Sequence, residues 1–406
     1  MHTFITFLGR KPRTEFSYQE TVYYFSDDTD TGPVSFIGWA LKSRIKPNPD
    51  QMIIVGTRSS MWDHLFENLE SEIDPELYQR FSRQIEAGNV EAPTLAKLEI
   101  QFKSQIKIPC HFVLVPRGEE IQEQITILKR IEAKIPEGAA VSLDVTHGFH
   151  HMPMFSLIIA QYLQRVKEVS IRNLFYASYD PDRGEGEVHN LIQLFGMNNW
   201  MTSLEAFEAS GDWSLFVKPL KDDVVNRPQI SHMNPAIKAM DLAGFYERVF
   251  LLSEAHESLQ LFKDALPEKF LGSADLFTDD LTQYLDMIQG AESIDCVTLA
   301  QFYLENNNYI RATIFAIEAV FMELATRKED IRDYQTRLDI EKSFADGERG
   351  TPRLYTAYTK LTLIRDTLAN GGVPRFARIK KMLAHPSKMK QHVQQLFYTL
   401  FPDFYA

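Results

Sequence analysis

The sequence predicts a chain in two parts, an α/β unit followed by an all-helical unit. Over roughly the first 195 residues, short apolar runs rich in β-branched residues alternate with segments of helical periodicity. Polar turns follow several of those runs. After residue 198 strand patterns nearly vanish, and apolar residues recur at helical spacing. We therefore expect a largely parallel, doubly wound sheet and then a helical bundle.

The expected strands of the first part are short apolar runs. They cover residues 2–8, 52–55, 111–116, 141–145, 169–177 and 188–194. Residues 20–25 and 34–41 also have strand character, and we expect them to form an edge hairpin or to lead into a helix. Helices are expected at residues 61–69, 119–134 and 154–166, with an acidic, irregularly helical excursion at residues 73–103.

In the second part the expected elements are helices. Helical spacing covers residues 204–208, 236–261, 273–288, 299–325 and 352–368. We expect a sheet domain at residues 1–200, a linker region at residues 201–235 and a helical domain at residues 236–406. Within the linker region, the polar stretch 218–235 contains three prolines and is the best candidate for the connection itself. The charged residues 327–350 should form an exposed helix and loop.

Bulk properties limit the classes of function. The chain has 406 residues and a net charge of -12, which argues against broad, sequence-independent binding to nucleic acid. Cys110 and Cys296 are the two cysteines, so no disulfide framework is predicted and a reducing cytoplasm fits. No apolar run is long enough to span a membrane. We expect a soluble cytoplasmic protein without a cofactor.

The most informative stretch is residues 141–153, where a buried strand ends in a polar turn and a helix follows. That position, between a strand's carboxyl end and a helix's amino end, is where open α/β sheets bind ligands. A glycine there lets the backbone approach a ligand, and free N–H groups favour an anion such as phosphate. The candidate residues of this turn are Asp144, Thr146, His147, Gly148 and His150.

Two other interpretations of this turn remain open. Any strand-to-helix junction needs turn formers and an N-cap, which Asp or Thr supply without a ligand. His147, His150 and His151 are also possible zinc ligands, but their spacing fits no familiar site and no HExxH or CxxC pattern accompanies them. We therefore predict no metal.

Two earlier turns have the same geometry. The first strand stops at a basic turn, and the strand at residues 52–55 ends in a turn rich in hydroxyls that also contains an arginine. Arginine binds phosphate through its planar fork, and hydroxyls cap a helix or orient a ligand. Taken alone, the first turn is explained equally well by an exposed basic loop without a ligand, and the second is more often a helix start than a ligand site. The candidate ligand contacts are Gly9, Arg10, Lys11, Thr57, Arg58, Ser59 and Ser60.

These motifs, in this order, resemble the CRISPR-associated CARF family. The resemblance lies in Asp144-Val145-Thr146-His147-Gly148-Phe149, in Gly56-Thr57 with Ser60-Met61-Trp62, and in Gly9. In the second part, Tyr309-Ile310-Arg311-Ala312 leading to Ile317-Glu318-Ala319 resembles the HEPN helices of CARF-HEPN effectors. The resemblance implies a Rossmann-like sensor joined to a HEPN bundle, acting as a homodimer in type III CRISPR defence. It also implies a cyclic oligoadenylate ligand, usually the tetra-adenylate.

The resemblance implies roles for the candidate residues. Ring nucleases of the family need no metal and hold a ribose 2'-hydroxyl in line with the adjacent phosphorus. By this analogy the cations bind phosphate charge, the hydroxyls orient the ring and a histidine transfers the proton. The assignments are Arg10, Lys11 and Arg58 for charge, Ser59, Ser60 and Thr146 for orientation, and His147 or His150 for proton transfer.

The second part departs from the HEPN catalytic pattern of an Arg followed by a His. Arg365 has Asn370 in the position expected of the histidine, and Asn cannot exchange a proton near neutral pH. Arg378 and His385 form an alternative pair with permitted spacing. The leading prediction is a sensor that cleaves its ring slowly beside a degenerate HEPN half. The alternatives are a ligand-activated ribonuclease cutting single-stranded RNA and a non-catalytic binding module.

Overall fold

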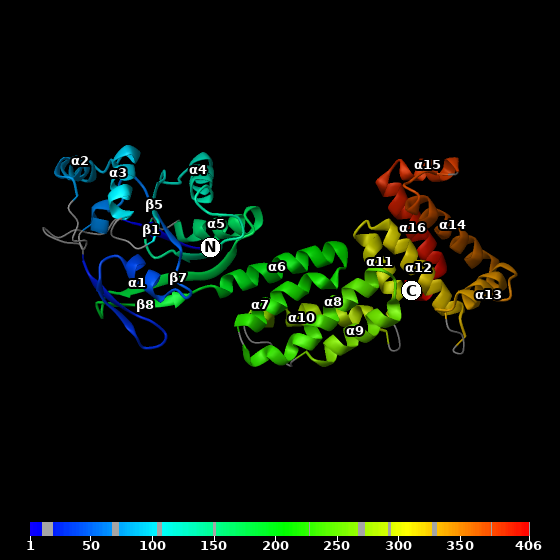
Figure 1. The fold of residues 1–406 in the computed structure, drawn as a ribbon. Coiled ribbons are helices and arrows are strands. Elements are labelled where there is room, and N and C mark those ends of the chain that lie inside the picture. Colours follow the sequence, from blue (N-terminus) through cyan, green and yellow to red (C-terminus); the bar gives the residue numbers. More distant parts are fainter. Residues whose placement is uncertain are drawn as a thin grey trace. The chain divides into compact units, whose positions relative to one another are not determined.

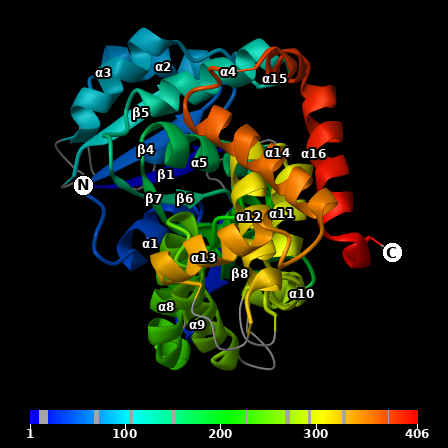
Figure 2. The same ribbon diagram turned by 90° about the vertical axis from the view of Figure 1, so that its right-hand side faces the viewer.

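The computed structural model describes residues 1–9, 19–66, 73–103, 108–148, 152–226, 228–266, 273–290, 294–326, 331–374 and 376–405. The chain divides into two compact units, Met1–Gln193 and Leu194–Ala406. Both are seen from two sides in Figures 1 and 2. The boundary falls close to the expected end of the sheet domain at residue 200.

The first unit contains one eight-stranded sheet in the order β3-β2-β8-β7-β6-β1-β4-β5. Strands β1, β4, β5, β6 and β7 run parallel to one another, as the doubly wound prediction requires. The strands are β1 His2–Leu8, β2 Thr21–Tyr24, β3 Asp30–Val34, β4 Gln51–Gly56, β5 Cys110–Leu114, β6 Ala140–Asp144, β7 Ser170–Asp180 and β8 Glu185–Asn190. The helices are α1 Ile37–Arg44, the short 3₁₀ helix η1 Trp62–Phe66, α2 Pro75–Glu86, α3 Ala92–Lys103, α4 Ile121–Glu132 and α5 Met152–Val166.

Helices cover both faces of this sheet. Alternate residues of β1, Phe4 and Leu8, pack in one core with side chains of α1, η1, α2 and α3. The connections that contain α4 and α5 run in the opposite direction along the strand order, so right-handed crossovers place these helices on the other face. There they bury Ile131 and Leu163. The period of two along the strands thus separates the two cores.

Three local expectations for the first unit need correction. Residues 20–25 form one strand of an edge hairpin, β2, but its partner β3 is Asp30–Val34, whereas residues 34–41 lead into the helix α1, the alternative expected for them. The helix expected at residues 61–69 is a 3₁₀ helix over Trp62–Phe66 in its described part. The last strand begins at Glu185 rather than at residue 188, because it pairs antiparallel with β7 across a tight turn.

The second unit is all-helical, as predicted. Its α-helices are α6 Gln193–Ser210, α7 Val217–Asn226, α8 Asn234–Arg248, α9 Leu252–Asp264, α10 Thr278–Ile288, α11 Cys296–Glu305, α12 Tyr309–Leu324, α13 Tyr334–Ala345, α14 Pro352–Ala369, α15 Ala377–Leu383 and α16 Pro386–Leu400. Short 3₁₀ helices are η2 Trp213–Phe216, η3 Pro228–Met233, η4 Ser273–Phe277 and η5 Pro402–Phe404. A single core cluster runs through these helices.

The linker expected at residues 201–235 is wrong. Helix α7 and the 3₁₀ helix η3 occupy most of residues 218–233, and α7 packs against α8. Leu220 is 2% exposed, and the buried carboxylate of Asp223 accepts a hydrogen bond of 3.0 Å from Trp200 Nε1 on α6. The charged residues of this stretch made its sequence look like a linker, although it also carries an apolar face that packs against the rest of the bundle.

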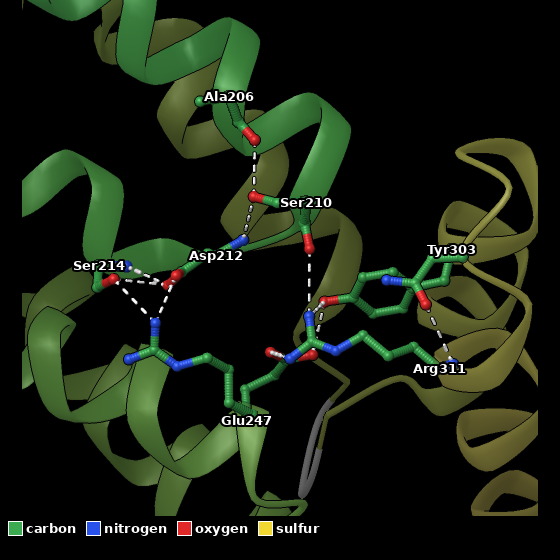
Figure 3. A network of polar contacts seen from close by, with 9 residues as sticks. Ala206, Ser210, Asp212, Ser214, Glu247, Tyr303 and Arg311 are labelled. Carbon is green, nitrogen blue, oxygen red and sulfur yellow. Dashed lines mark hydrogen bonds and ion pairs between the residues drawn. The ribbon is translucent and has the colours of Figure 1, made fainter. Parts of the chain in front are cut away.

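A buried polar network joins four helices of the second unit (Figure 3). The Arg311 guanidinium of α12 donates to the Ser210 carbonyl oxygen at 3.1 Å, to Tyr303 Oη of α11 at 2.7 Å and to Glu247 Oε2 of α8 at 3.1 Å. Tyr303 Oη in turn donates to Glu247 Oε1 at 2.7 Å. Burial raises the pKa of Glu247, and the Arg311 charge opposes that shift. The network therefore neutralises one buried carboxylate.

Candidate functional site

The site begins where β1, β4 and β6 end together. β1 lies between the other two, with Leu8 opposite Gly56 and Thr6 opposite Asp144. Because all three strands are parallel, the turns that follow them meet at one edge of the sheet. The connection through α1 leads to β4 on one side of β1, whereas the connection from β6 through α5 leads to β7 on the other side. This is the switch point where open α/β sheets bind ligands.

Gly9, which follows β1, contacts both the turn after β4 and the turn after β6. Its carbonyl oxygen accepts a hydrogen bond of 3.0 Å from the Met61 N–H, just after the turn at residues 57–60. A Cβ at Gly9 would lie 2.9 Å from the backbone nitrogen of Gly148, so a side chain would push the two backbones apart. Gly148 itself has a φ of 128°, which favours glycine. The two glycines thus allow two backbone segments to lie in close contact, whereas the sequence had predicted only that Gly148 lets the backbone approach a ligand.

The hydroxyl-rich turn after β4 is held by its own side chains. Ser60 Oγ accepts from the Thr57 N–H at 2.9 Å, and Thr57 Oγ1 lies 3.2 Å from Ser60 Oγ and 3.3 Å from Ser59 Oγ. Trp62 Nε1 donates to the Thr57 carbonyl oxygen at 2.8 Å. Thr57 and Ser60 are buried, which leaves Arg58 and Ser59 as the more accessible side chains of this turn.

Asp144 is a structural centre of the turn after β6, and its predicted ligand contact stays a prediction. Its carboxylate is fully buried and accepts from Thr6 Oγ1 at 2.7 Å and from the Thr146 N–H at 3.0 Å. Thr146 Oγ1 accepts from the Ala177 N–H of β7 at 2.9 Å. Burial raises the pKa of Asp144, and the hydrogen bonds from Thr146 and Thr6 oppose that shift.

His147 lies against the aromatic layer on the α1 side of the sheet. Its ring stacks on Phe36, with the centroids 5.8 Å apart and an interplanar angle of 26°. Phe36 also makes an edge contact with His64 at 6.2 Å. His147 is 8% exposed, so its ring is oriented by packing. Arg10, Lys11 and His150, also predicted for this site, lie outside the described residues.

A pocket of about 1140 Å³ opens at the strand ends on the β5 side. Thr57, Arg58 and Ser59 line it, whereas Thr146 and His147 are not among its lining residues. Arg58 Nη1 donates to Asn89 Oδ1 at 2.9 Å, and Arg130 donates to the Leu114 carbonyl oxygen. Both guanidiniums bind neutral oxygens in these contacts, whereas Glu91, Glu120 and Glu123 also line the pocket, so the cationic and acidic side chains that line it balance.

Sequence reasoning missed Arg117, Thr126 and Arg130, which also line this pocket. The turn after β5 begins with Pro116-Arg117-Gly118, and the rule that identified the other strand-end turns applies to it equally. Arg130 had no such signal, because it lies on α4 and reaches the strand end only through the packing of that helix.

The second unit places the HEPN-like residues on α14 and beyond. Arg365 Nε and Nη2 donate to Asp366 Oδ1 at 2.9 Å and 2.7 Å. Asn370 is the C-cap of α14, and its Nδ2 donates to the Asp366 carbonyl oxygen at 2.7 Å. In the alternative pair, His385 precedes α16, and the side chain of Arg378 is outside the described part. The predicted roles of both pairs remain predictions.

Two further features concern metals and membranes. Within the ranges that the structure describes, no group of three or more His, Cys, Asp and Glu side chains is arranged to hold a metal ion. His150 and His151 fall outside those ranges. Among the described helices, none is long and apolar enough to cross a bilayer.

Comparison with known proteins agrees with this architecture. Residues 3–181 match the family described as "CRISPR system endoribonuclease Csx1, CARF domain". CRISPR-associated protein MJ1674 of Methanocaldococcus jannaschii is 22% identical over 399 residues, which make up 92% of this chain and 60% of that protein. The chain therefore spans about 60% of the length of this curated relative. Csm6 of Enterococcus italicus, solved with cyclic hexa-2'-fluoro-hexa-dAMP, aligns over 99% of this chain and 95% of its own, with 10% identity and a TM-score of 0.35.

The first unit is thus a CARF domain, an α/β sensor fold of CRISPR-associated proteins. The match over residues 3–181 and the relative MJ1674 support the CARF-HEPN family that the sequence motifs predicted.

Proposed function

We propose that the CARF unit binds cyclic oligoadenylate, with cyclic tetra-adenylate as the preferred ring, in type III CRISPR defence. The observation that carries the proposal is the meeting of three strand-end turns at Gly9, beside a pocket lined by Arg58 and Arg130. A cyclic oligoadenylate presents several phosphates around a small ring, so it suits N–H groups and cations spread along one sheet edge. A homodimer would place two such edges around one ring.

We further propose that the bound ring is cleaved slowly and without a metal. The ribose 2'-oxygen forms a bond to the adjacent phosphorus while the bond to the 5'-oxygen breaks, leaving a 2',3'-cyclic phosphate and a 5'-hydroxyl. The attacking hydroxyl loses its proton to a base, and the leaving oxygen gains one. His147 or His150 supplies proton transfer, Arg58 and Ser59 bind phosphate, and Thr146 and Ser60 hold the turns in place.

Support for the arrangement comes from the rigidity of the turns rather than from any single side chain. Asp144 fixes the Thr146 N–H, and Ser60 fixes the Thr57 N–H. Such preorganisation favours in-line geometry because less ordering remains to be done when the ring binds. The pair Arg365 and Asn370 makes strong RNA cleavage by the second unit the less favoured function, since Asn370 stands where the histidine is expected and cannot accept a proton.

The first prediction tests binding and cleavage together. Calorimetry with cyclic tetra-adenylate should give one ring per dimer, with affinity that falls as salt rises because phosphate contacts release counterions. Arg58→Ala should weaken binding, whereas His147→Ala should slow the appearance of linear product more than it weakens binding. Product formation should persist in EDTA.

The matched control is Arg165→Ala. Arg165 is an exposed arginine in the last turn of α5, which lies at the opposite end of the sheet from the turns. Its loss should leave affinity unchanged. If no cyclic oligoadenylate gives heat at micromolar protein, or if Arg165→Ala weakens binding as much as Arg58→Ala, the proposed site is wrong.

A further inference from the structure

A second pocket lies in the helical unit, where α14, α15 and α16 pack together (Figures 1 and 2). Its volume is about 420 Å³, within the usual range of about 300 to 1,000 Å³ for ligand pockets. It is lined by Lys360, Leu363, Ile364, Phe376, Ile379, Lys381, Met382, Lys388 and His392. Arg365 and Asn370 are not among these residues, so the pocket is separate from the HEPN-like pair.

Each of the three helices turns one side toward this pocket. Leu363 and Ile364 follow Lys360 by three and four residues on α14, so the three side chains lie on the same side of that helix. Ile379 and Met382 are three residues apart on α15, and the two lining residues of α16 are four apart. The pocket is therefore built by the packing of three helices.

The floor of the pocket is apolar and aliphatic. Ile364, Ile379 and Met382 are buried at 2%, 7% and 8% exposure. Leu363 is half-buried and packs against the core of the unit. None of these four side chains offers a strong hydrogen bond, and methionine adapts its shape to what it packs against. Such a floor suits a flexible hydrocarbon chain.

The rim of the pocket is cationic. Lys360, Lys381 and Lys388 are all exposed, and within the part of the chain that the structure describes they have no hydrogen-bond or ion-pair partner. Lys390 on α16 differs, because its Nζ donates to the Glu305 carbonyl oxygen at 2.9 Å. No acidic residue is among the described side chains that line the pocket. The rim is therefore complementary to an anion that stays at the water-exposed mouth.

The two parts of the pocket fit two parts of one molecule, an apolar tail and an anionic head. Lysine is a point charge on a flexible stem, so three lysines select negative charge rather than a particular head-group shape. Phe376, which is 52% exposed just before α15, adds apolar surface at the mouth. A cationic amphiphile would be repelled by the rim, and a neutral one would leave the lysines unpaired.

We propose that the α14–α16 pocket binds a single-chain amphipathic anion of the fatty-acid class. The hydrocarbon chain lies on the aliphatic floor, and the carboxylate lies between Lys381 and Lys388. The site concerns the helical unit alone, so it does not depend on ring binding by the CARF unit or on the chemistry of Arg365.

Calorimetry of the full chain with octanoate, nonanoate and decanoate, each below its micelle concentration, tests the proposal. Each added methylene should tighten binding about fourfold, the effect of burying one methylene group. Decan-1-ol has the same tail without the charge, so it should bind about fivefold more weakly. Decyltrimethylammonium, with the opposite charge, should not bind. Affinity for decanoate should fall as salt rises, whereas affinity for decan-1-ol should not.

Two sets of variants separate the rim from the apolar part. Lys381→Ala with Lys388→Ala should weaken decanoate binding about fivefold and leave decan-1-ol binding unchanged, because the lysines contact only the charge. Phe376→Ala should weaken both ligands by the same factor, about fivefold, because the ring contacts only the tail. Circular dichroism of each variant separates loss of binding from loss of fold.

Matched controls come from exposed residues elsewhere in the same unit. Lys238→Ala with Lys342→Ala removes two exposed lysines on α8 and α13, and Tyr334→Ala removes an exposed aromatic ring on α13. These variants should bind both ligands as the unaltered chain does.

The proposal is overturned if decanoate does not bind, if affinity does not depend on chain length, or if the control variants lose as much affinity as the pocket variants. Sedimentation of the chain with phosphatidylglycerol vesicles, without binding of free decanoate, would also overturn it, because the basic rim would then contact a membrane surface and the pocket would hold no free anion.

Discussion

At the scale of single residues, Asp144 shows how a motif residue can stabilise the fold. Its carboxylate is fully buried with a raised pKa, so the native state retains a proton that the unfolded chain releases near the ordinary value of 3.8. Between pH 3.8 and the raised pKa of Asp144, the native state therefore binds more protons than the unfolded state does. The free energy of unfolding of the first unit should therefore fall as pH rises through this window.

Asp144→Asn tests this second prediction, because the amide cannot titrate. At low pH the protonated Asp144 stabilises the native state, so the variant is expected to be less stable there than the unaltered protein. The free energy of unfolding of the variant should, however, vary less with pH. Urea unfolding at a series of pH values, followed by hydrogen exchange in peptides from residues 1–193, measures both curves. Curves that run parallel for the two proteins would mean that Asp144 does not titrate between the folded and unfolded states.

At the scale of elements, the network around Arg311 ties α8, α11 and α12 to the end of α6. The third prediction is that Arg311→Met lowers the free energy of unfolding of the second unit by about 3 to 5 kcal/mol, because it leaves the Glu247 carboxylate buried without its cation. Glu247 is 1% exposed, so water cannot replace the lost charge. Adding Glu247→Gln to Arg311→Met should recover part of the loss. Chemical denaturation of the second unit measures each step.

Arg248 provides the control for this prediction. It pairs with Asp212, which lies close to the same network, but the Arg248 side chain is 42% exposed. Arg248→Met should therefore cost only about 0 to 1 kcal/mol, as solvent-exposed ion pairs do. Equal losses for Arg248→Met and Arg311→Met would show that burial does not set the strength of this network.

At the scale of the whole molecule, the two units have separate hydrophobic cores. The core around Phe4 and Trp62 shares no residue with the core around Phe315 and Phe397. The fourth prediction is that Phe315→Ala, at a fully buried position, lowers the unfolding temperature of the second unit alone, because a cavity of this kind costs about 3 to 5 kcal/mol locally. Calorimetry should show one shifted and one unshifted transition.

Ligand binding should shift the unfolding transition of the first unit instead of the second. Cyclic tetra-adenylate should raise the transition of the first unit in both the unaltered chain and Phe315→Ala, since a ligand stabilises the state that it binds. A single transition that moves as a whole in Phe315→Ala would contradict independent unfolding of the two units.

The sequence by itself determined the class of fold and the position of the candidate site. Strand and helix periodicities depend on neighbours within a few residues, so the alternating elements of the first unit and the helices of the second were predictable. Three polar turns after strands located the site for the same reason. The prediction of a linker at residues 201–235 was wrong because it rested on local charge, whereas the apolar face of this segment packs against α6 and α8.

The tertiary structure decided how the described site residues are buried and held. Thr6 and Asp144 are 138 positions apart in the chain, and only the pairing of β1 with β6 brings them together and buries the carboxylate. The same folding brings Gly9 against Gly148 and carries Arg130 of α4 to the strand ends. Burial and contact between distant segments depend on the order of strands in the sheet. That order arises from packing of the whole unit, which no local pattern encodes.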